Sequence, residues 1–295
     1  MPKPLSEYSW RDVLRLQPLI HASKTLRYGR VDRAYLRRPA PDGGLEALGA
    51  AVTGRRVLVT VAFEDAEAVA LQARLVRDLV PADLHLVADN SPTTAGAGRI
   101  RAAAAREGAA YLRLPHNPWT GRNPSRSHGA AMNYVWIHVL RPGRPDRFGF
   151  LDQDLFPTKP DDPFAPLDRV EWFGDIRRAG TRWFLWAGWC FFRFAAVADR
   201  PLDFGLDWFA GLDTGGANWD VLYRHADPER LPRRPVVTVP AWPGADVSRA
   251  CLEWRGAWLH EVGFGDDRSA RHEKRAAVKA ILEPLLVAAG PGTRS

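Results

Sequence analysis

The sequence contains only two cysteines, Cys190 and Cys251, and they lie far apart in the chain. Neither belongs to a Cys-x-x-Cys pair, which excludes the usual zinc–thiolate site. We expect both to be buried and reduced, as in a cytoplasmic protein. No run of about 18 apolar residues occurs, so no membrane-spanning helix is expected. The N-terminus also lacks the apolar core of a signal peptide.

Positively charged residues are in modest excess over negatively charged ones, and the rest of the composition is ordinary. Hydrophobic residues make up 46% and charged residues 25% of the 295 residues, which is typical of a globular protein with a sizeable core. The formal net charge of +7 favours an anionic partner such as a phosphate group or an acidic membrane surface. An Arg-rich and Ala-rich coding bias would produce the same balance. Basic and aromatic residues are not interleaved in a nucleic-acid-binding pattern, so no nucleic-acid partner is expected.

Residues 1–50 read as a helical extension of the main domain. Trp10, Val13, Leu14, Leu16 and Leu19 have helical spacing within a segment rich in Arg and Lys. Such a helix either packs on its own domain or lies on an anionic membrane surface. The stretch RRPAPDGG at 37–44 then reads as a linker.

Strand and helix patterns alternate after the extension. The expected strands are 55–63, 83–92, 110–117 and 147–151, and the expected helices are 65–80, 97–108 and 125–140, the last capped by Ser125. This order predicts an α/β fold with a mostly parallel, Rossmann-like sheet flanked by helices. After about residue 160 the pattern loosens. There we expect strands at 181–197 and 234–242, a short helix at 214–225 and a C-terminal helix.

Polar residues follow the predicted strands at the edge where such sheets bind ligands. They are Asp65, Asp89, Asn90, Asn117, Asp152 and Asp154. The pair Asp152 and Asp154 ends the run FGFLDQD. Two carboxylates this close repel each other unless a hard divalent cation such as Mg²⁺ or Mn²⁺ lies between them. A surface turn that happens to carry two acids is the alternative.

The order of these motifs resembles the GT-A glycosyltransferases, particularly the family-two-like group. The resemblance covers roughly residues 55–265 and rests on RRVLVTVAF, LVADNSP, the His116-Asn117 strand end, NPSRSHGAAMN and FLDQDLFP. It implies a nucleotide-sugar-binding half at 51–160 and an acceptor-binding half of the same domain at 161–295. In that family the Asp-x-Asp motif holds a metal that bridges the donor diphosphate.

The resemblance assigns roles to donor-side residues. Asp154 would be the direct metal ligand, and Asp152 would face the ribose or a metal-bound water. The residues implied to lie at the base, ribose or phosphates are Glu64, Asp65, Asp89, Asn90, Arg126 and His128. A late histidine, His260, would be an additional ligand to Mn²⁺ or Mg²⁺. A structural role is the alternative for each histidine.

The acceptor half contains an aromatic run, WFLWAGWCFFRF, at 183–194. Trp183, Trp186 and Trp189 are candidates for stacking on sugars, although such residues also build cores. Gly188 resembles the family's glycine where the backbone passes close to the donor sugar. Asp213, before Thr-Gly-Gly, best matches the carboxylate that acts as general base in inverting members, although it departs from the Glu-Asp pair of many relatives. A helix cap is its alternative role, and Asp207 and Asp220 are weaker candidates for the base.

These features predict metal-dependent transfer of a sugar from a nucleotide-diphosphate sugar to an acceptor hydroxyl, with inversion by analogy to the family. A nucleotidyltransferase on a related sheet is a second hypothesis. That class usually has a Gly-rich basic loop after the first strand, whereas VAFEDAE at 61–67 is acidic and has no glycine. A non-catalytic carbohydrate-binding protein is a third hypothesis. We expect a cytoplasmic protein, with peripheral membrane contact as the alternative to packing of the basic N-terminal helix on its own domain.

Overall fold

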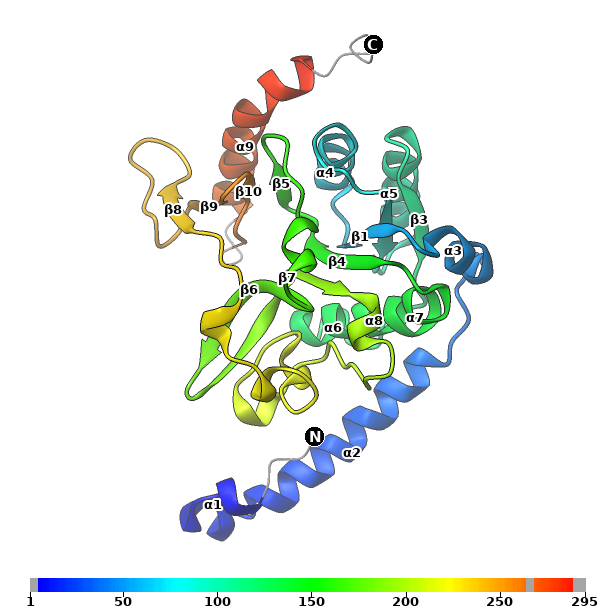
Figure 1. Ribbon diagram of the computed structural model, residues 1–295. Helices are drawn as coiled ribbons and strands as arrows, with labels where there is room; N and C mark the ends of the chain where they lie inside the picture. The colour runs from blue at the N-terminus through cyan, green and yellow to red at the C-terminus, as the bar shows by residue number, and fades with distance from the viewer. Residues whose placement is uncertain (1–4, 264–267, 289–295) are drawn as a thin grey trace.

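The computed structural model describes residues 5–263 and 268–288 (Figure 1) and confirms the α/β fold. A six-stranded sheet has the order β3-β2-β1-β4-β7-β6. The parallel strands are β1 (Arg56–Ala62), β2 (Leu84–Asp89), β3 (Ala110–Arg113) and β4 (Arg147–Asp152). Strands β7 (Arg182–Arg193) and β6 (Trp172–Ala179) extend the sheet in antiparallel fashion. The two predicted halves of the chain thus share one sheet; the boundary between them stays a prediction.

Helices cover both faces of this sheet, which is why β1 is apolar and buried along almost its whole length. One face carries α4 (Ala66–Leu79) and α5 (Thr94–Arg106). The other carries α3 (Leu45–Val52), α6 (Pro124–Val135), a π-helical segment (Trp136–Leu140) and α7 (Arg141–Gly143). The cap of α6 is Asn123, whose side chain accepts a hydrogen bond from the Arg126 N–H, so the predicted cap at Ser125 was wrong by two residues.

A second, antiparallel sheet lies beside the first and has the order β5-β10-β9-β8. Its strands are β5 (Leu155–Pro157), β10 (Trp258–His260), β9 (Cys251–Arg255) and β8 (Val236–Pro240). Helix α9 (Arg268–Ala288) packs on it through Val278 and Leu282. Because β5 begins one residue after Asp154, this sheet starts at the Asp-x-Asp turn.

The remaining segments of the second half are short. They comprise α8 (Phe194–Val197) and 3₁₀ turns at Ala165–Asp168, Trp208–Ala210, Gly216–Asn218, Tyr223–His225 and Pro228–Arg230. The helix predicted at 214–225 is therefore two separate 3₁₀ turns. Gly215 precedes the first of them with a φ of 92°, a left-handed conformation that suits glycine.

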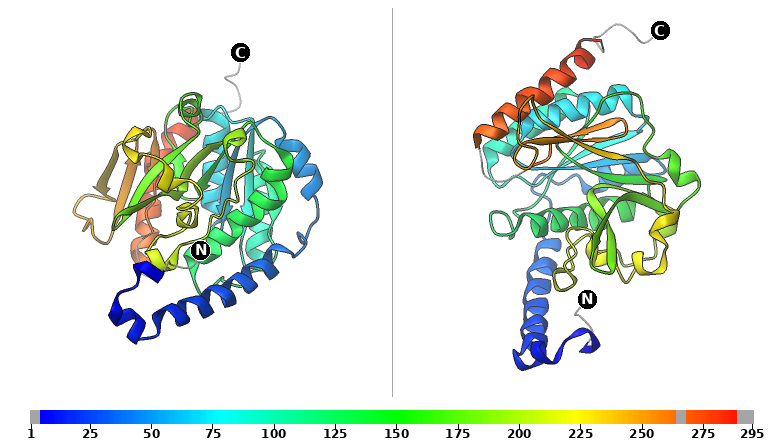
Figure 2. Two further views of the ribbon diagram at one scale, coloured as in Figure 1. Left: turned by 60° about the horizontal axis from the view of Figure 1, so that its bottom comes forward. Right: turned by 90° about the vertical axis from the view of Figure 1, so that its left-hand side faces the viewer.

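The N-terminal segment is helical, as predicted, but it is broken. After a 3₁₀ turn at Leu5–Glu7, α1 (Trp10–Leu14) and α2 (Gln17–Leu36) meet at Leu16, which has a left-handed φ of 54°. The C-terminal half of α2 packs on α6, whereas α1 and the first half of α2 lie at the edge of the molecule, away from the sheet (Figures 1 and 2).

Both cysteines are buried and unbonded to each other, as expected. Throughout 5–263 and 268–288, every helix is too short or too polar to cross a membrane. The predicted cytoplasmic location stays a prediction.

Candidate metal and nucleotide site

Asp152, Asp154 and His260 lie together at the carboxyl edge of β4. One oxygen or nitrogen atom from each side chain lies within 4.8 Å of the corresponding atoms of the other two. His260 Nε2 is 3.5 Å from Asp154 Oδ1. Two carboxylates and one imidazole at this spacing form a ligand set for a divalent cation. The three residues that the sequence predicted as metal ligands are thus neighbours in space.

A turn, rather than a continuous strand, brings the two aspartates close together. In an uninterrupted strand residues 152 and 154 would share a face but lie about 6.6 Å apart along it. Here β4 ends at Asp152 and β5 begins at Leu155. The Gln153 amide clamps this turn to the end of β1, accepting a hydrogen bond from the Phe63 N–H (2.7 Å) and donating one to the Phe63 carbonyl (3.2 Å).

Gln72 of α4 fixes the same turn from below. Its amide nitrogen donates to the carbonyl oxygens of Asp152 (2.6 Å) and Leu155 (2.7 Å), and its oxygen accepts from Thr60 Oγ1 (2.6 Å). Gln72 is fully buried, so these bonds satisfy carbonyl groups that water does not reach. The turn is held by side chains from two other elements.

Gly188 leaves the space that the Asp152 carboxylate occupies. A Cβ atom at Gly188 would lie 2.4 Å from Asp152 Oδ2 and 2.4 Å from the Trp186 ring. The family resemblance places this glycine near the donor sugar; in the structure its neighbour is the Asp152 carboxylate.

A bulge in β7 places Trp186 and Gly188 at the site. Between the pairs Gly174–Cys190 and Ile176–Leu185, β7 advances five residues while β6 advances two. The three extra residues form the bulge, and such irregularities often re-aim side chains beside active sites. The Trp186 ring then lies 4.9 Å from the His260 ring, centroid to centroid.

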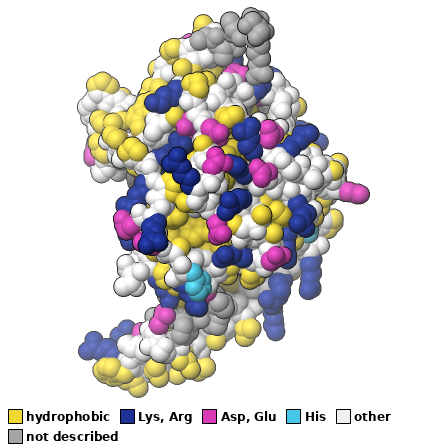
Figure 3. Space-filling view, viewed as in Figure 1, with side chains coloured by type: hydrophobic (Ala, Val, Ile, Leu, Met, Phe, Trp, Pro, Cys, Tyr) yellow, Lys and Arg dark blue, Asp and Glu magenta, His cyan; other side chains and the backbone are white. Residues whose placement is uncertain are grey.

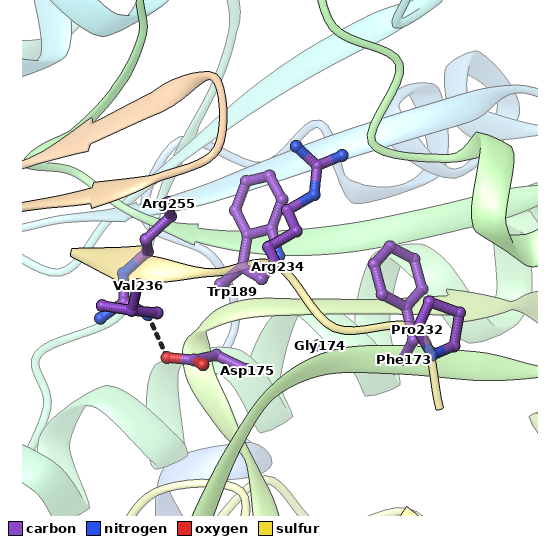
Figure 4. Close-up of a pocket in the computed structure, with 8 residues that line it drawn as sticks. All are labelled: Phe173, Gly174, Asp175, Trp189, Pro232, Arg234, Val236 and Arg255. Atoms are coloured by element: carbon purple, nitrogen blue, oxygen red, sulfur yellow. Dashed lines mark hydrogen bonds and ion pairs between the residues drawn. The ribbon is translucent and has the colours of Figure 1, made fainter. Parts of the chain in front are cut away.

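His260 is oriented by a carboxylate behind it. Its Nδ1 lies 3.3 Å from Glu253 Oε2, which leaves Nε2 facing Asp154. A carboxylate behind a metal-binding histidine fixes the ring and its tautomer. Glu253 also pairs with Arg255, which is buried and pairs in turn with Asp175. Figure 4 marks the Arg255–Asp175 bond beside a small cavity that Arg234 and Trp189 also line.

The charges of this cluster shift its pKa values. Burial alone would lower the pKa of His260, but Asp154, Glu253 and Asp152 outweigh it and raise the pKa to about 9. The hydrogen bond from His260, with the nearby Arg255, lowers the pKa of Glu253 to about 2. Burial, together with the charge of Asp154, raises the pKa of Asp152 despite the opposing effect of His128. Asp152 and Asp154 are therefore two carboxylates that repel each other, an arrangement that a bound cation would relieve.

A cavity of about 420 Å³ opens beside the two aspartates. Its lining combines the ends of β1 and β4 with the first turn of α6, including Phe63, Asn90, Ser127, His128 and Asp152. His128 Nδ1 lies 3.7 Å from Asp152 Oδ1, and its buried Nε2 has no hydrogen-bond partner in the structure. The positive end of α6 at this wall favours an anionic ligand.

Asn90 and Ser127 belong to a hydrogen-bonded wall of this cavity. Asn90 Nδ2 donates to Ser127 Oγ (2.9 Å), and Asn90 Oδ1 accepts from Asn117 Nδ2 (3.0 Å). The predicted residues Asn90 and His128 thus line the cavity.

Glu64 and Asp65 line a second cavity, of about 380 Å³, which shares Phe63, Gln153 and Asp154 with the first. Glu64 has a left-handed φ of 54°, and its carboxylate accepts hydrogen bonds from the N–H and Oγ1 of Thr93 at the start of α5.

Asp65 caps α4 and pairs with Arg275 at 2.8 Å. Burial would raise the pKa of Asp65, but Arg275 outweighs this effect and lowers the pKa. Contact of Glu64 or Asp65 with the base stays a prediction.

The Asp89 carboxylate is hydrogen-bonded to other residues of the protein. It is fully buried and accepts hydrogen bonds from Tyr111 (2.7 Å), the Ser91 N–H (2.9 Å) and Arg113 (3.1 Å). A ligand would have to displace one of these partners to reach it. Its predicted contact with the ribose stays a prediction that this burial disfavours.

Arg126 contacts α2 rather than the cavity. Its guanidinium lies 3.2 Å from Asp32 and over the rings of Tyr28 (4.5 Å) and Trp119 (4.9 Å). Approach to a phosphate would break all three contacts.

The three tryptophans predicted to stack on sugars, Trp183, Trp186 and Trp189, differ in how deeply they are buried. Trp183 packs against Trp172 and Tyr223, and Trp189 packs against Phe191 and Trp258. Both tryptophans are almost completely buried, so a sugar face cannot stack on them without rearrangement. Trp186 is half-buried and faces His260, which leaves it as the candidate for a sugar contact.

Asp213 is exposed, and it lies between the buried residues Leu212 and Thr214 on a loop that touches the start of α6. Its carboxylate accepts a hydrogen bond from the Thr214 N–H (2.8 Å), and Thr214 Oγ1 donates to the Ser125 carbonyl (2.9 Å). The loop is thereby attached to the helix that lines the cavity. Asp207 pairs with Arg182 and Asp220 with Arg224, whereas no cation pairs with Asp213 in the described part of the chain.

The sequence analysis missed three residues that the structure brings to this site. Glu253 orients His260, Gln72 holds the Asp-x-Asp turn, and Phe63, 42% exposed, lines both cavities. Phe63 could have been predicted from the sequence, since it is a large apolar residue between a strand and an acidic loop. The roles of Glu253 and Gln72 depend on long-range packing, so no local sequence pattern could have indicated them.

No family model matches the chain, and no curated protein matches it either. Among solved structures, the chain is similar to the apo structure of WbbM, a bifunctional glycosyltransferase, with 13% identity and a TM-score of 0.32. The match covers 50% of this chain and 32% of WbbM, so it spans about a third of that protein's length. A likeness this distant carries no functional argument, and the functional conclusion rests on the geometry of the site.

Proposed function

We propose that the protein is a glycosyltransferase that uses a divalent cation, Mn²⁺ or Mg²⁺, to bind a nucleotide-diphosphate sugar. The observation that carries this proposal is the convergence of Asp152, Asp154 and His260 beside a cavity walled by the positive end of α6. A metal ligand set next to an anion-binding helix start is what a diphosphate donor requires.

The three side chains fit a divalent cation in number, type and spacing. Asp154 and His260 would be direct ligands, and Asp152 would complete the set from the strand end. Glu253 would hold the Nδ1–H side of His260, so that Nε2 can bind the metal once the cation has displaced its proton. When bound, the cation would offset negative charge on the departing diphosphate.

The first cavity is the proposed donor site. His128, whose side chain lines this cavity, would interact with a phosphate oxygen, and the first turn of α6 adds its positive dipole. The exposed ring of Phe63 offers a flat apolar surface for the base. The base and the sugar are left open.

The acceptor would approach from the side of Trp186 and the 207–213 loop. Asp213 is the proposed general base, because its carboxylate is exposed and lies on a loop attached to α6. It would remove the proton of the attacking hydroxyl, which gives inversion if the hydroxyl attacks the donor sugar directly. The acceptor is a glycan or another molecule with a free hydroxyl.

Release of a nucleoside diphosphate tests the proposal. Purified protein is incubated with a panel of nucleotide-diphosphate sugars, with Mn²⁺ or with a chelator, and the freed diphosphate is measured. We expect release from one donor class, dependent on the cation. Pyrophosphate formation from a nucleoside triphosphate and a sugar phosphate would instead indicate a nucleotidyltransferase. Sugar binding without cation dependence or turnover would indicate a carbohydrate-binding protein.

A further inference from the structure

The N-terminal helices carry a concentrated apolar surface. More than half of the strongly exposed large apolar side chains in the described residues belong to residues 5–26. We define the apolar tip as Leu5, Trp10, Val13, Leu14, Leu16, Leu19 and Ile20. Trp10, Leu14 and Leu19 are 68%, 72% and 67% exposed. A patch of this kind on a water-facing surface marks an interaction site.

The tip is held in a fixed direction by its other side. His21 stacks on Phe209 with ring centroids 4.1 Å apart, and Glu7 pairs with Arg182 at 2.7 Å. Farther along α2, Tyr28 packs edge-on against Trp119 and Asp32 bonds the same indole. These contacts attach one side of the N-terminal helices to the main domain. The side chains of the apolar tip face outward on the other side.

Cationic side chains accompany the apolar tip. Arg11, Arg15, Lys24 and Arg27 are all exposed. Within residues 5–30 the acids are Glu7 and Asp12; Glu7 pairs with Arg182 and Asp12 caps α1. Figure 3 shows yellow apolar atoms at the lower edge of the molecule next to dark blue cationic ones.

We propose that this tip docks on an anionic phospholipid surface, with its apolar side chains inserted at the headgroup level and Arg11, Arg15, Lys24 and Arg27 against the lipid phosphates. Trp and Leu prefer that depth, and cationic residues beside them add attraction to an anionic leaflet. The sequence pattern alone left open whether a single helix packs on its own domain or lies on a membrane surface. The break at Leu16 and the packing of the second half of α2 favour insertion by the tip instead.

Charge favours this occupant over a second copy of the chain. Self-association through the tip would bring two sets of four cations together at the edge of the apolar contact, which is repulsive. A lipid surface supplies the opposite charge. The 207–213 loop contacts this extension through Phe209, so the proposed acceptor side would lie near the membrane.

Co-sedimentation with vesicles tests the inference. The full chain is mixed with vesicles of phosphatidylcholine and phosphatidylglycerol at a 3:1 ratio, and with phosphatidylcholine vesicles alone. We expect binding to the mixed vesicles that falls at least tenfold on pure phosphatidylcholine or in high salt. Two variants address the two parts of the surface: Trp10→Ser/Leu14→Ser/Leu19→Ser and Arg11→Gln/Arg15→Gln/Lys24→Gln. Each should weaken binding at least tenfold.

Matched controls make the same changes elsewhere. Val236→Ser/Val237→Ser removes exposed apolar side chains of β8, and Arg141→Gln/Arg169→Gln/Arg230→Gln removes three exposed charges. Both should bind like the unmodified chain. Gln keeps the helix propensity of Arg, so the charge variant tests the surface even if the serine variant loses α1. Equal binding of variants and controls would overturn the inference, as would a dimer in sedimentation velocity that only the tip variants dissociate.

Discussion

At the scale of single residues, the candidate site depends on a glycine, Gly188, whose lack of a side chain leaves room for a neighbouring carboxylate. Gly188 has no Cβ, and the Asp152 carboxylate fills that space at 2.4 Å from the ideal Cβ position. The backbone of the β7 bulge is the fixed part of this contact, so a methyl group would displace the carboxylate.

We therefore predict that Gly188→Ala weakens Mn²⁺ binding about tenfold or more, because Asp152 must move to relieve the overlap. Binding is measured by calorimetry on the purified variant. Gly98→Ala is the matched control, since a Cβ at Gly98 meets nothing within 4 Å. Unchanged affinity in Gly188→Ala would remove Asp152 from the metal site.

Glu253 should act on the metal through His260. We predict that Glu253→Gln lowers Mn²⁺ affinity by roughly 10-fold to 100-fold, the range seen when the carboxylate behind a metal-bound histidine is lost. Gln keeps the shape and a hydrogen-bond acceptor but removes the charge that pairs with His260 and the buried Arg255, so the thermal midpoint should also fall. Metal affinity is therefore compared at a temperature at which both proteins are folded. Glu229→Gln, in an exposed ion pair, is the control and should bind Mn²⁺ normally. Equal affinity of the two variants would contradict the positioning role.

Asp213 is tested by Asp213→Asn, which keeps the hydrogen bond from the Thr214 N–H but removes the base. Sugar transfer should fall by about 100-fold or more, within the range for loss of a general base, while donor binding stays nearly constant. Asp207→Asn and Asp220→Asn are compared in parallel. If Asp213→Asn transfers sugar normally and one of the others does not, the base is a different carboxylate.

At the scale of elements, the alternation of strands and helices along the chain and the position of the Asp-x-Asp motif were predictable because both depend on local patterns. Each buried parallel strand is a short apolar run, and polar residues end it. The bulge in β7 was not predictable, since its three extra residues are defined by pairing with β6. This bulge explains why Trp186 faces the site while Trp183 and Trp189, on the same strand, pack in two different parts of the core.

The buried hydrogen-bond chain across β1, β2 and α4 predicts a dependence of stability on pH. His85 Nε2 lies 2.9 Å from Thr60 Oγ1, and its Nδ1 is buried without a partner among residues 5–263 and 268–288. Burial lowers the pKa of His85 from 6.5 to about 4. The unfolded chain takes up a proton near pH 6.5 while the folded protein stays neutral. The contribution to stability is therefore complete above pH 6.5 and is lost as the pH falls toward 4.

Urea unfolding at pH 7 and at pH 4.5 measures this effect. We predict that the free energy of unfolding falls by about 2–3 kcal/mol more in the unmodified protein than in His85→Gln, which has no titrating group at this position. Equal losses in the two proteins would show that His85 does not stay neutral in the folded state.

At the scale of the whole molecule, the metal ligand set joins residues from two sheets. Asp152 and Asp154 end the first sheet, and His260 ends β10 of the second. The sequence predicted His260 only through resemblance to a family, because more than 100 residues separate it from the aspartates. The physical link is the pairing of His260 with Leu155, directly after the turn. The N-terminal extension was also predicted, but its break at Leu16 and its exposed tip were not.

The central claim is that Asp152, Asp154 and His260 form a cation site that binds a nucleotide diphosphate. Calorimetric titration of nucleoside diphosphates, with and without Mn²⁺, tests it most directly when the unmodified protein is compared with Asp154→Ala and with Asp42→Ala, an exposed acid distant in sequence from the ligand set. We predict Mn²⁺-dependent binding in the unmodified protein and in Asp42→Ala, and its loss in Asp154→Ala with the fold intact by circular dichroism. The same Mn²⁺ dependence in Asp154→Ala, or nucleotide binding that ignores Mn²⁺ in the unmodified protein, would contradict the account.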